Sequence, residues 1–409
     1  MRKTMILIVL SAVLMGGCVS DRTFDRSIPA IKDTLLPFPS KETIDLAPSD
    51  PVEKLLASMT LEEKVGQLVI AGFYGTSVDE VTEDLITEAK LGGLIFFGRN
   101  VESTSQLVGL LNTFKRIESK IPLFLSIDEE GGSVSRLPSD IANLPGARTI
   151  MKKNVLNLTY EEGRAIGYAL DEYGFNMNFA PVLDVDNGKS NSVIGSRSFS
   201  TDPMVVAELG VLMARGMEEH GVIPVVKHFP GHGDTAVDSH AGTPIVKHPM
   251  DRLNNVELYP FAYAIERDIP AIMVGHIILS KVDAKVPSTL SYAVMTGLLR
   301  NQMKFEGVVV TDDLGMGAIS ADHTQAEAAV LSIKAGADIV MISHGRRDPF
   351  KAVAALKKAV LDGVIPMAML DQKVRRILRL KLRFKIDQTP HDQVDVGKIN
   401  EWFNELRKK

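Results

Sequence analysis

One stretch of fourteen residues, KHFPGHGDTAVDSH at positions 227–240, concentrates side chains that can do chemistry. It contains three of the nine histidines of the chain, together with one lysine and two aspartates. These residue types transfer protons, hold polar ligands and bind divalent metals, and Lys and Asp are poor residues for a hydrophobic core. We therefore interpret this stretch as part of a functional site.

The elements around this stretch follow a regular alternation. From about residue 51 onward, short apolar runs recur, and most are followed by a segment with helical spacing. The eight runs are QLVIAGF, LGGLIFFG, IPLFLSIDEEGG, MNFAPVLDVD, GVIPVVKHFPGHG, IPAIMVGHIILS, EGVVVTDDLGM and GADIVMISHG. Nearly continuous apolar runs are typical of buried parallel strands. Eight of them predict an α/β protein with a (β/α)8 TIM-type barrel in a single catalytic domain. A doubly wound dinucleotide-binding sheet would carry a GxGxxG turn after its first strand, and that turn is absent here.

Helical spacing between the runs supports this alternation. Thr60 and Glu63 have the spacing of a capping box. A later helix is predicted to bury one face, formed by Leu107, Leu110, Leu111, Phe114 and Ile117. Near the C-terminus, DQKVRRILRLKLRFKI is predicted to be the last barrel helix, with solvated basic side chains and a buried stripe formed by Val374, Ile377, Leu378 and Leu382. The alternative is a basic helix that lies on an anionic membrane.

Polar residues follow six of the predicted strands. They are Asp128 and Glu129, Asp184 and Asp186, Lys227 and His228, His276, Asp312 and Asp313, and His344. In a barrel these positions share the C-terminal mouth, where the active site of this fold lies. Glu129, Asp186 and Asp313 could instead cap helices or support other residues. His276 and His344 could be hydrogen-bonded walls of the pocket.

Several motifs in barrel order carry a family resemblance. KHFPGHGDTAVDSH, IDEEGGSVSRL, NFAPVLDVD, IGSRSFS and LSYAVMTGLLRNQMKFEGVVVTDDLGM resemble those of glycoside hydrolase family 3 over about residues 52–385. They are most similar to its β-N-acetylhexosaminidase branch. The resemblance implies an exo-acting glycosidase that removes terminal N-acetylglucosamine from β-linked glycosides such as peptidoglycan fragments.

The resemblance also implies roles for individual residues. Asp312 matches the nucleophile, His240 matches the acid/base, and Asp238 matches the carboxylate that orients this histidine. The positions that hold the sugar hydroxyls are matched by Asp128, Arg136, Arg197, Lys227 and His228. A histidine held by a neighbouring aspartate can protonate a leaving group and later activate water near neutral pH. The sequence therefore predicts a retaining mechanism with a covalent glycosyl-enzyme.

The resemblance implies no metal and no organic cofactor, but two other functions stay open. His228, His232 and His240, with Asp234 and Asp238, could hold a divalent ion in a metal-dependent barrel hydrolase. The PGHG segment argues against this, because it breaks any helix that would present histidines four residues apart. The other alternative is a non-catalytic sugar-binding lipoprotein.

Two positions depart from the family pattern, and both lie beside matched residues. Ser133 stands where the family usually has Arg, and Ser196 stands where it usually has Asn or Asp. Related enzymes that cleave plain glucosides take their acid/base from a second domain. The roughly 25 residues after position 385 are too few for such a domain, so we expect the acid/base to come from the barrel.

The N-terminal segment has the layout of an export signal. Arg2 and Lys3 precede an apolar run too short to span a bilayer, and LMGGC, which ends at the only cysteine, Cys18, resembles a lipobox. We expect a signal peptide with lipobox at 1–18, a tether at 19–48, the catalytic domain at 49–388 and a C-terminal tail at 389–409. Cys18 would be the lipidation site of an exported bacterial lipoprotein, membrane-anchored in the periplasm or at the cell surface. A net charge of -5 argues against a nucleic-acid partner.

Overall fold

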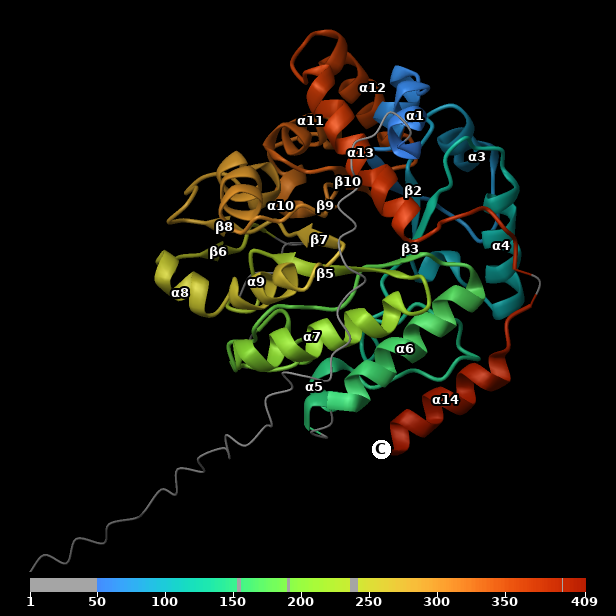
Figure 1. Ribbon diagram of the computed structural model, residues 1–409, viewed down its shortest axis with the longest axis vertical. Coiled ribbons are helices and arrows are strands. Elements are labelled where there is room, and N and C mark those ends of the chain that lie inside the picture. The colour runs from blue at the N-terminus through green and yellow to red at the C-terminus, as the bar shows by residue number, and fades with distance from the viewer. Residues whose placement is uncertain (1–49, 153–155, 190–191, 236–241, 392) are drawn as a thin grey trace, which may run out of the picture. The chain divides into compact units, whose positions relative to one another are not determined.

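Eight parallel strands close into a barrel at the centre of the protein (Figure 1). The computed structural model describes residues 50–152, 156–189, 192–235, 242–391 and 393–409, all within one compact unit that spans residues 43–409. The strands of the barrel are β1 (Val69–Gly72), β2 (Gly93–Phe96), β3 (Phe124–Ile127), β4 (Met177–Asn178), β5 (Ile223–Phe229), β7 (Ala271–Val274), β9 (Val308–Asp313) and β10 (Ile339–Ile342). Their neighbour order is β1-β10-β9-β7-β5-β4-β3-β2. This confirms the predicted (β/α)8 barrel, and each predicted apolar run contains one of its strands.

Two details of the strands were not predicted. The sixth run forms β7 and then a separate strand, β8 (Ile278–Leu279), which pairs outside the barrel with β6 (Ile245–Val246). The fourth strand, β4, is only two residues long, and the chain then contacts β5 again through an isolated bridge between Val182 and Lys227. This second departure lies beside β5, the strand that carries the densest group of candidate site residues.

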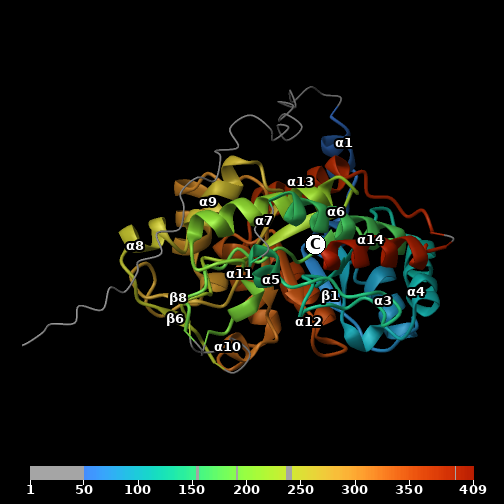
Figure 2. The same ribbon diagram turned by 90° about the horizontal axis from the view of Figure 1, so that it is seen from below.

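Helices surround the barrel (Figures 1 and 2). They are α1 (Pro51–Ala57), α2 (Leu61–Gly66), α3 (Glu80–Thr87), α4 (Thr104–Arg116), α5 (Ala147–Lys152), α6 (Leu156–Tyr173), α7 (Pro203–Glu218), α8 (Met250–Asn255), α9 (Tyr259–Glu266), α10 (Gly317–Ser320), α11 (Gln325–Ala335), α12 (Asp348–Leu361), α13 (Met367–Arg383) and α14 (Val396–Lys408). Shorter or wider helical turns are η1 (Gly98–Asn100), η2 (Gly195–Arg197), η3 (Ser288–Leu290) and η4 (Ala293–Gln302). The segment predicted as a C-terminal tail contains α14, which packs beside α6 and buries Ile399, Phe403 and Leu406.

The predicted helix signals are largely present. At the start of α2, Thr60 N donates to Glu63 Oε2 at 2.8 Å and Glu63 N donates to Thr60 Oγ1 at 3.2 Å, so both halves of the capping box form. The predicted face of α4 is buried as far as Phe114, whereas Ile117 is the residue that ends the helix and is only half-buried. Phe114 packs edge-to-face against Phe73 and Phe96, which fixes this helix on the barrel.

The prediction for the basic helix α13 is partly wrong. Val374, Ile377 and Leu378 are buried, but the side chain of Leu382 is 51% exposed, and Lys373 and Lys381 are buried rather than solvated. Lys381 Nζ donates to Gln67 Oε1 and to the carbonyl oxygens of Gly92 and Pro122, at 2.6–3.0 Å. Burial lowers the pKa of Lys381 well below its ordinary value. A long side chain can thus bring its amine to backbone carbonyls beneath the barrel, which an apolar pattern does not reveal.

Among the helices of the described residues, none combines the length and the apolar character that crossing a bilayer requires.

Candidate active site

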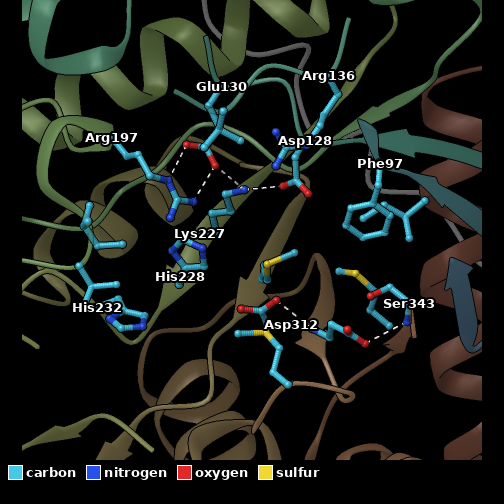
Figure 3. Close-up of a pocket in the computed structure, with 18 of the residues that line it drawn as sticks. Phe97, Asp128, Glu130, Arg136, Arg197, Lys227, His228, His232, Asp312 and Ser343 are labelled. Atoms are coloured by element: carbon cyan, nitrogen blue, oxygen red, sulfur yellow. Dashed lines mark hydrogen bonds and ion pairs between the residues drawn. The ribbon is translucent and has the colours of Figure 1, made fainter. Parts of the chain in front are cut away.

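A cavity of about 300 Å³ opens at the C-terminal ends of the barrel strands. Six of the predicted site residues line it: Asp128, Arg136, Arg197, Lys227, His228 and Asp312. Figure 3 shows them converging from different strands and loops. The predicted acid/base pair, Asp238 and His240, lies outside the described residues. The volume is at the small end for ligand pockets and suits one sugar-sized ligand.

Four charged side chains form a connected group along one wall of this cavity (Figure 3). Lys227, on β5, places its Nζ 2.6 Å from Asp128 Oδ1 and 2.7 Å from Glu130 Oε1. Arg197, on η2, donates from Nε to Glu130 Oε2 at 2.9 Å and from Nη2 to Glu130 Oε1 at 2.7 Å. We call Asp128, Glu130, Arg197 and Lys227 the charged wall. Its donors and acceptors are set in place before any ligand binds.

The ionisation of the charged wall follows from its mutual contacts. Burial opposes ionisation of Glu130, but the charge of Lys227 and the hydrogen bonds from Arg197 lower the pKa of this carboxyl to about 2. Burial also opposes the charge on Lys227, yet Asp128 and Glu130 raise the pKa of its amine above the ordinary value. Glu130 and Lys227 are therefore both charged at neutral pH, and they offer a strong acceptor and a strong donor for hydroxyl groups.

His228 is held by a buried aspartate at the end of the fourth run. Asp184 Oδ2 lies 2.7 Å from His228 Nδ1, and Asp184 Oδ1 accepts from the backbone N–H of His232 at 2.6 Å. Burial opposes ionisation of Asp184, but the charge and hydrogen bond of His228 lower the pKa of this carboxyl. Because Nδ1 is occupied, His228 presents Nε2 as its second ring nitrogen.

Arg136 is positioned by Glu129, the first glutamate of the DEEGG segment. Glu129 Oε2 accepts from the backbone N–H of Arg136 at 2.7 Å, from the backbone N–H of Leu137 at 3.2 Å and from Ser135 Oγ at 3.0 Å. Burial raises the pKa of Glu129 to about 7 despite these donors. Glu129 does not line the cavity, so it supports the loop that carries Arg136.

Asp312, the penultimate residue of β9, lies across the cavity from the charged wall (Figure 3). One of its oxygens, Oδ1, accepts the backbone N–H of Asp313 at 2.8 Å, and its side chain is only partly buried. Asp313 itself is buried and accepts from the backbone N–H groups of Ser343 and Gly315, at 2.9 and 3.1 Å. Asp313 thus holds the end of the strand, while Asp312 presents a carboxylate to the cavity.

Of the remaining residues at strand ends, some support neighbouring residues and one lines the cavity. Asp186 binds Arg148 at 2.9 Å. His276 is buried, with Nδ1 2.8 Å from Thr289 Oγ1 and Nε2 2.8 Å from the carbonyl oxygen of Asp313. His344 lines the cavity and pairs with Asp313 through Nδ1.

The predicted metal ligands give a mixed result. Among the described residues, Asp234, His248 and Glu257 have donor atoms spaced closely enough for an ion. Asp234 Oδ2 already lies 2.7 Å from His248 Nε2, and Glu257 Oε1 lies 3.0 Å from Arg252. The Nδ1 atoms of His228 and His232 are likewise engaged, by Asp184 and by Thr235 Oγ1. These donor atoms therefore already have protein partners, whereas the other two predicted ligands, Asp238 and His240, lie outside the described residues.

The sequence of the barrel matches a known enzyme family. The model for "Glycosyl hydrolase family 3 N terminal domain" matches residues 60–380, well over half of the chain. The chain belongs to glycosyl hydrolase family 3. The predicted enzyme class, a glycoside hydrolase, is the class of this family.

Relatives with names or solved structures agree with the family. Beta-hexosaminidase A of Pseudoalteromonas piscicida is 36% identical over an alignment of 335 residues that covers 75% of this chain and 56% of that protein. Beta-hexosaminidase LpqI of Mycobacterium tuberculosis is 32% identical over 80% of this chain and 84% of its own. A family 3 beta-N-acetylglucosaminidase from Paenibacillus sp. has a solved structure with a TM-score of 0.82 and 40% identity, covering 85% of this chain and 68% of that one. The chain spans little more than half of the Pseudoalteromonas protein.

The two departures from the family 3 pattern have a structural consequence. Ser133 and Ser196, both exposed, line a second hollow of about 130 Å³ beside Glu130 and Arg197. Larger side chains at these positions would occupy this space. The bidentate pair between Arg197 and Glu130 nevertheless forms, so the departures leave the charged wall intact.

Glu130 is the site residue that the sequence reasoning missed. It lies in the same DEEGG segment as Asp128. The sequence placed Asp128 in the predicted site but not Glu130. Charge balance could have found it, because Lys227 and Arg197 on one rim need more than the single carboxylate of Asp128.

Proposed function

We propose that this protein is a retaining exo-β-N-acetylglucosaminidase that removes terminal N-acetylglucosamine from β-linked glycosides. The observation that carries the proposal is the position of Asp312, a partly exposed carboxylate that faces the charged wall across a cavity of about 300 Å³. A sugar whose hydroxyls contact the charged wall has its anomeric carbon on the side of Asp312. A cavity of this size holds one sugar, which favours action at a chain end.

In the first step, a carboxylate oxygen of Asp312 attacks the anomeric carbon as the glycosidic C–O bond breaks. His240, held by Asp238, donates its proton to the departing oxygen. The products are a free aglycone alcohol and a glycosyl ester on Asp312. Asp128, Arg136, Arg197, Lys227 and His228 hold the sugar throughout, and their fixed positions avoid the cost of organising donors during the reaction.

In the second step, neutral His240 takes a proton from water, and the water oxygen attacks the anomeric carbon. The ester bond to Asp312 breaks, the carboxylate is restored, and two inversions leave the product with the β configuration. Histidine can serve in both directions near neutral pH because its ordinary pKa is about 6.5. The DSH segment at 238–240 supports this assignment through its match to the hexosaminidase motif.

The sugar and the source of the substrate are supported by the relatives. Two relatives are named as beta-hexosaminidases, and a third, of solved structure, as a beta-N-acetylglucosaminidase. Fragments of peptidoglycan contain β-linked N-acetylglucosamine, and we propose such fragments as the natural substrate class.

We also propose that the protein is an exported lipoprotein anchored through Cys18. The support is the signal-like segment that ends in LMGGC at the only cysteine. The full chain should fractionate with membranes, and Cys18→Ala should release it into the soluble fraction. Recovery of both forms in the soluble fraction would contradict the anchor.

The activity is tested with a chromogenic β-N-acetylglucosaminide and the corresponding β-glucoside, each with and without chelator. The proposal predicts chelator-resistant cleavage of the acetamido sugar and weak cleavage of the glucoside. Loss of cleavage with chelator would favour the metal-dependent hydrolase, and cleavage of neither sugar would favour a sugar-binding protein.

A further inference from the structure

One wall of the cavity has no role in the proposed reaction. It is formed by Phe97, which follows β2, and by Ser343 and His344, which follow β10. In the barrel order, β10, β1 and β2 are consecutive, while β3, β4 and β5 carry or precede the charged wall. Figure 3 shows Phe97 and Ser343 on the side of the cavity away from Arg197 and His228. We call Phe97, Ser343 and His344 the second wall.

The position of the second wall relative to Asp312 determines which part of a substrate it meets. His344 binds through Nδ1 to Asp313, the residue that directly follows Asp312, and β10 is the neighbour of β9. A sugar held by the charged wall presents its hydroxyls to β3–β5 and its anomeric carbon to Asp312. Displacement by Asp312 requires the aglycone on the opposite face of the sugar, toward the mouth of the cavity, and the half-exposed side chain of His344 lies at this mouth.

His344 has the geometry of a ligand-binding residue rather than of a core histidine. Its Nδ1 is taken by Asp313, so Nε2 is the ring nitrogen available to a ligand, and 54% of its side-chain surface is exposed. The hydrogen bond from His344 to Asp313 raises the pKa of the imidazole, while burial and the charge of Arg99 oppose the rise. A fixed ring with a positive charge is a suitable donor for an anionic acceptor.

An aromatic ring and a second cation lie beside His344. The Phe97 and His344 ring centroids are 6.4 Å apart, and the guanidinium of Arg99 lies 4.3 Å from the Phe97 centroid. Arg99 Nη2 donates to the carbonyl oxygen of Ser343 at 2.9 Å, which fixes the cation beside this wall. Phe97 offers an apolar face for a ring, and the cations offer charge at its edge.

We propose that the second wall binds the aglycone and that His344 selects aglycones bearing a carboxylate or another acidic group. This inference rests on the proposed glycosidase activity and deepens it. The charged or titratable groups around His344 are Asp312 and Asp313 of β9, Arg99 of η1 and Tyr74, whose hydroxyl accepts from the N–H of Gly345. Asp313 is already committed to three donors, so His344 Nε2 is the group of the second wall that can donate to an acidic aglycone.

The test uses two aryl β-N-acetylglucosaminides that differ only in a carboxylate or a carboxamide on the aryl leaving group. The measured quantity is the ratio of kcat/KM for the acid to that for the amide, so that effects on the sugar or on proton transfer cancel. For the full chain at about pH 5.5 we expect a ratio of roughly threefold to tenfold, the range for a half-exposed charged hydrogen bond. The ratio should fall toward one as the pH rises to about 9, because His344 loses its charge while the carboxylate keeps its own.

His344→Asn separates the charge from the local structure, because its amide can still donate to Asp313. We expect this variant to bring the ratio at pH 5.5 close to one. His220→Asn, at the opposite end of the barrel where α7 leads into β5, is the matched control and should keep the ratio of the unmodified chain. A ratio that does not change with pH, or that survives in His344→Asn, would overturn the assignment. Cleavage of neither substrate by the unmodified chain would instead refute the glycosidase activity on which it rests.

Discussion

Arg197 donates two parallel hydrogen bonds to Glu130, from Nε to Oε2 at 2.9 Å and from Nη2 to Oε1 at 2.7 Å. Lys227 adds a third donor to the same carboxylate, at 2.7 Å from Oε1. Glu130 therefore joins the two cations that face the sugar in the proposed complex, although it is itself a positioning residue. Without it, buried Lys227 and partly exposed Arg197 would lie beside a single carboxylate, Asp128.

Replacing this carboxylate should damage stability and substrate binding together. Glu130→Gln is expected to lower the free energy of unfolding by about 3 kcal/mol, as for other broken buried ion pairs. It should also lower kcat/KM by about thirtyfold, the equivalent of ~2 kcal/mol. Urea unfolding and steady-state kinetics measure the two effects. Glu62→Gln, which breaks an exposed pair with Lys357, is the control and should cost less than about 1 kcal/mol. Equal losses of stability and of kcat/KM in the two variants would contradict the role of Glu130.

Removing the proposed nucleophile should abolish turnover while the fold persists. Asp312→Asn is expected to lower kcat on the order of 10³-fold or more, as in other enzymes that lose a nucleophile. Asp322→Asn changes an exposed aspartate beyond β9 and should retain full activity. Substantial turnover by Asp312→Asn, with circular dichroism unchanged, would argue against the nucleophile.

The proposed acid/base can be tested through the leaving group. Asp238→Asn should lower kcat/KM, which reports the first step, by about 10²–10⁴-fold for a poor leaving group that needs protonation. A dinitrophenyl leaving group departs without a proton, so kcat/KM for its substrate should be much less affected. The comparison of the two rates in one variant measures proton donation directly. A uniform loss for both leaving groups would show that Asp238 acts in binding or folding instead.

The raised pKa of Glu129 should make the stability of the fold depend on pH. Burial raises its pKa from 4.5 to about 7 in the folded protein, so between those values the folded state holds a proton that the unfolded state has released. The free energy of unfolding should therefore fall as the pH rises from 4.5 to 7, by about 3 kcal/mol in total, and this group should add no change above pH 7. The Glu129→Gln variant should not show this fall. Its free energy of unfolding should therefore rise, relative to that of the unmodified chain, between pH 4.5 and 7. If urea unfolding gave parallel curves of stability against pH for the two proteins, the raised pKa of Glu129 would be refuted.

The barrel was predictable because each strand lies in an apolar run, and polar residues follow six of the eight runs. Parallel strands buried on both faces need such runs, and the C-terminal ends of the strands meet at one mouth, so Asp128, Lys227 and Asp312 could be placed in one site before any coordinates. The fourth strand shows the limit. Its run is ten residues long, but only Met177 and Asn178 pair as β4, because pairing depends on the neighbouring strand as well as on composition.

Side-chain partners were harder to predict than strands. Glu130, buried Lys373 and Lys381, and exposed Leu382 all depart from the simple expectation that apolar residues are buried and charged ones solvated. Lys381 reaches backbone carbonyls from a helix that lies far from them in sequence, and no local pattern encodes such a contact. The same applies to the bond between His344 and Asp313, whose residues are 31 positions apart.

The stereochemistry of the first product tests the central claim most directly. Proton NMR can record the anomer that the full chain releases from a β-N-acetylglucosaminide before mutarotation mixes the two forms. The double displacement through Asp312 predicts that β-N-acetylglucosamine appears first. Initial release of the α anomer would mean that water attacks the substrate directly, and it would contradict the covalent role of Asp312.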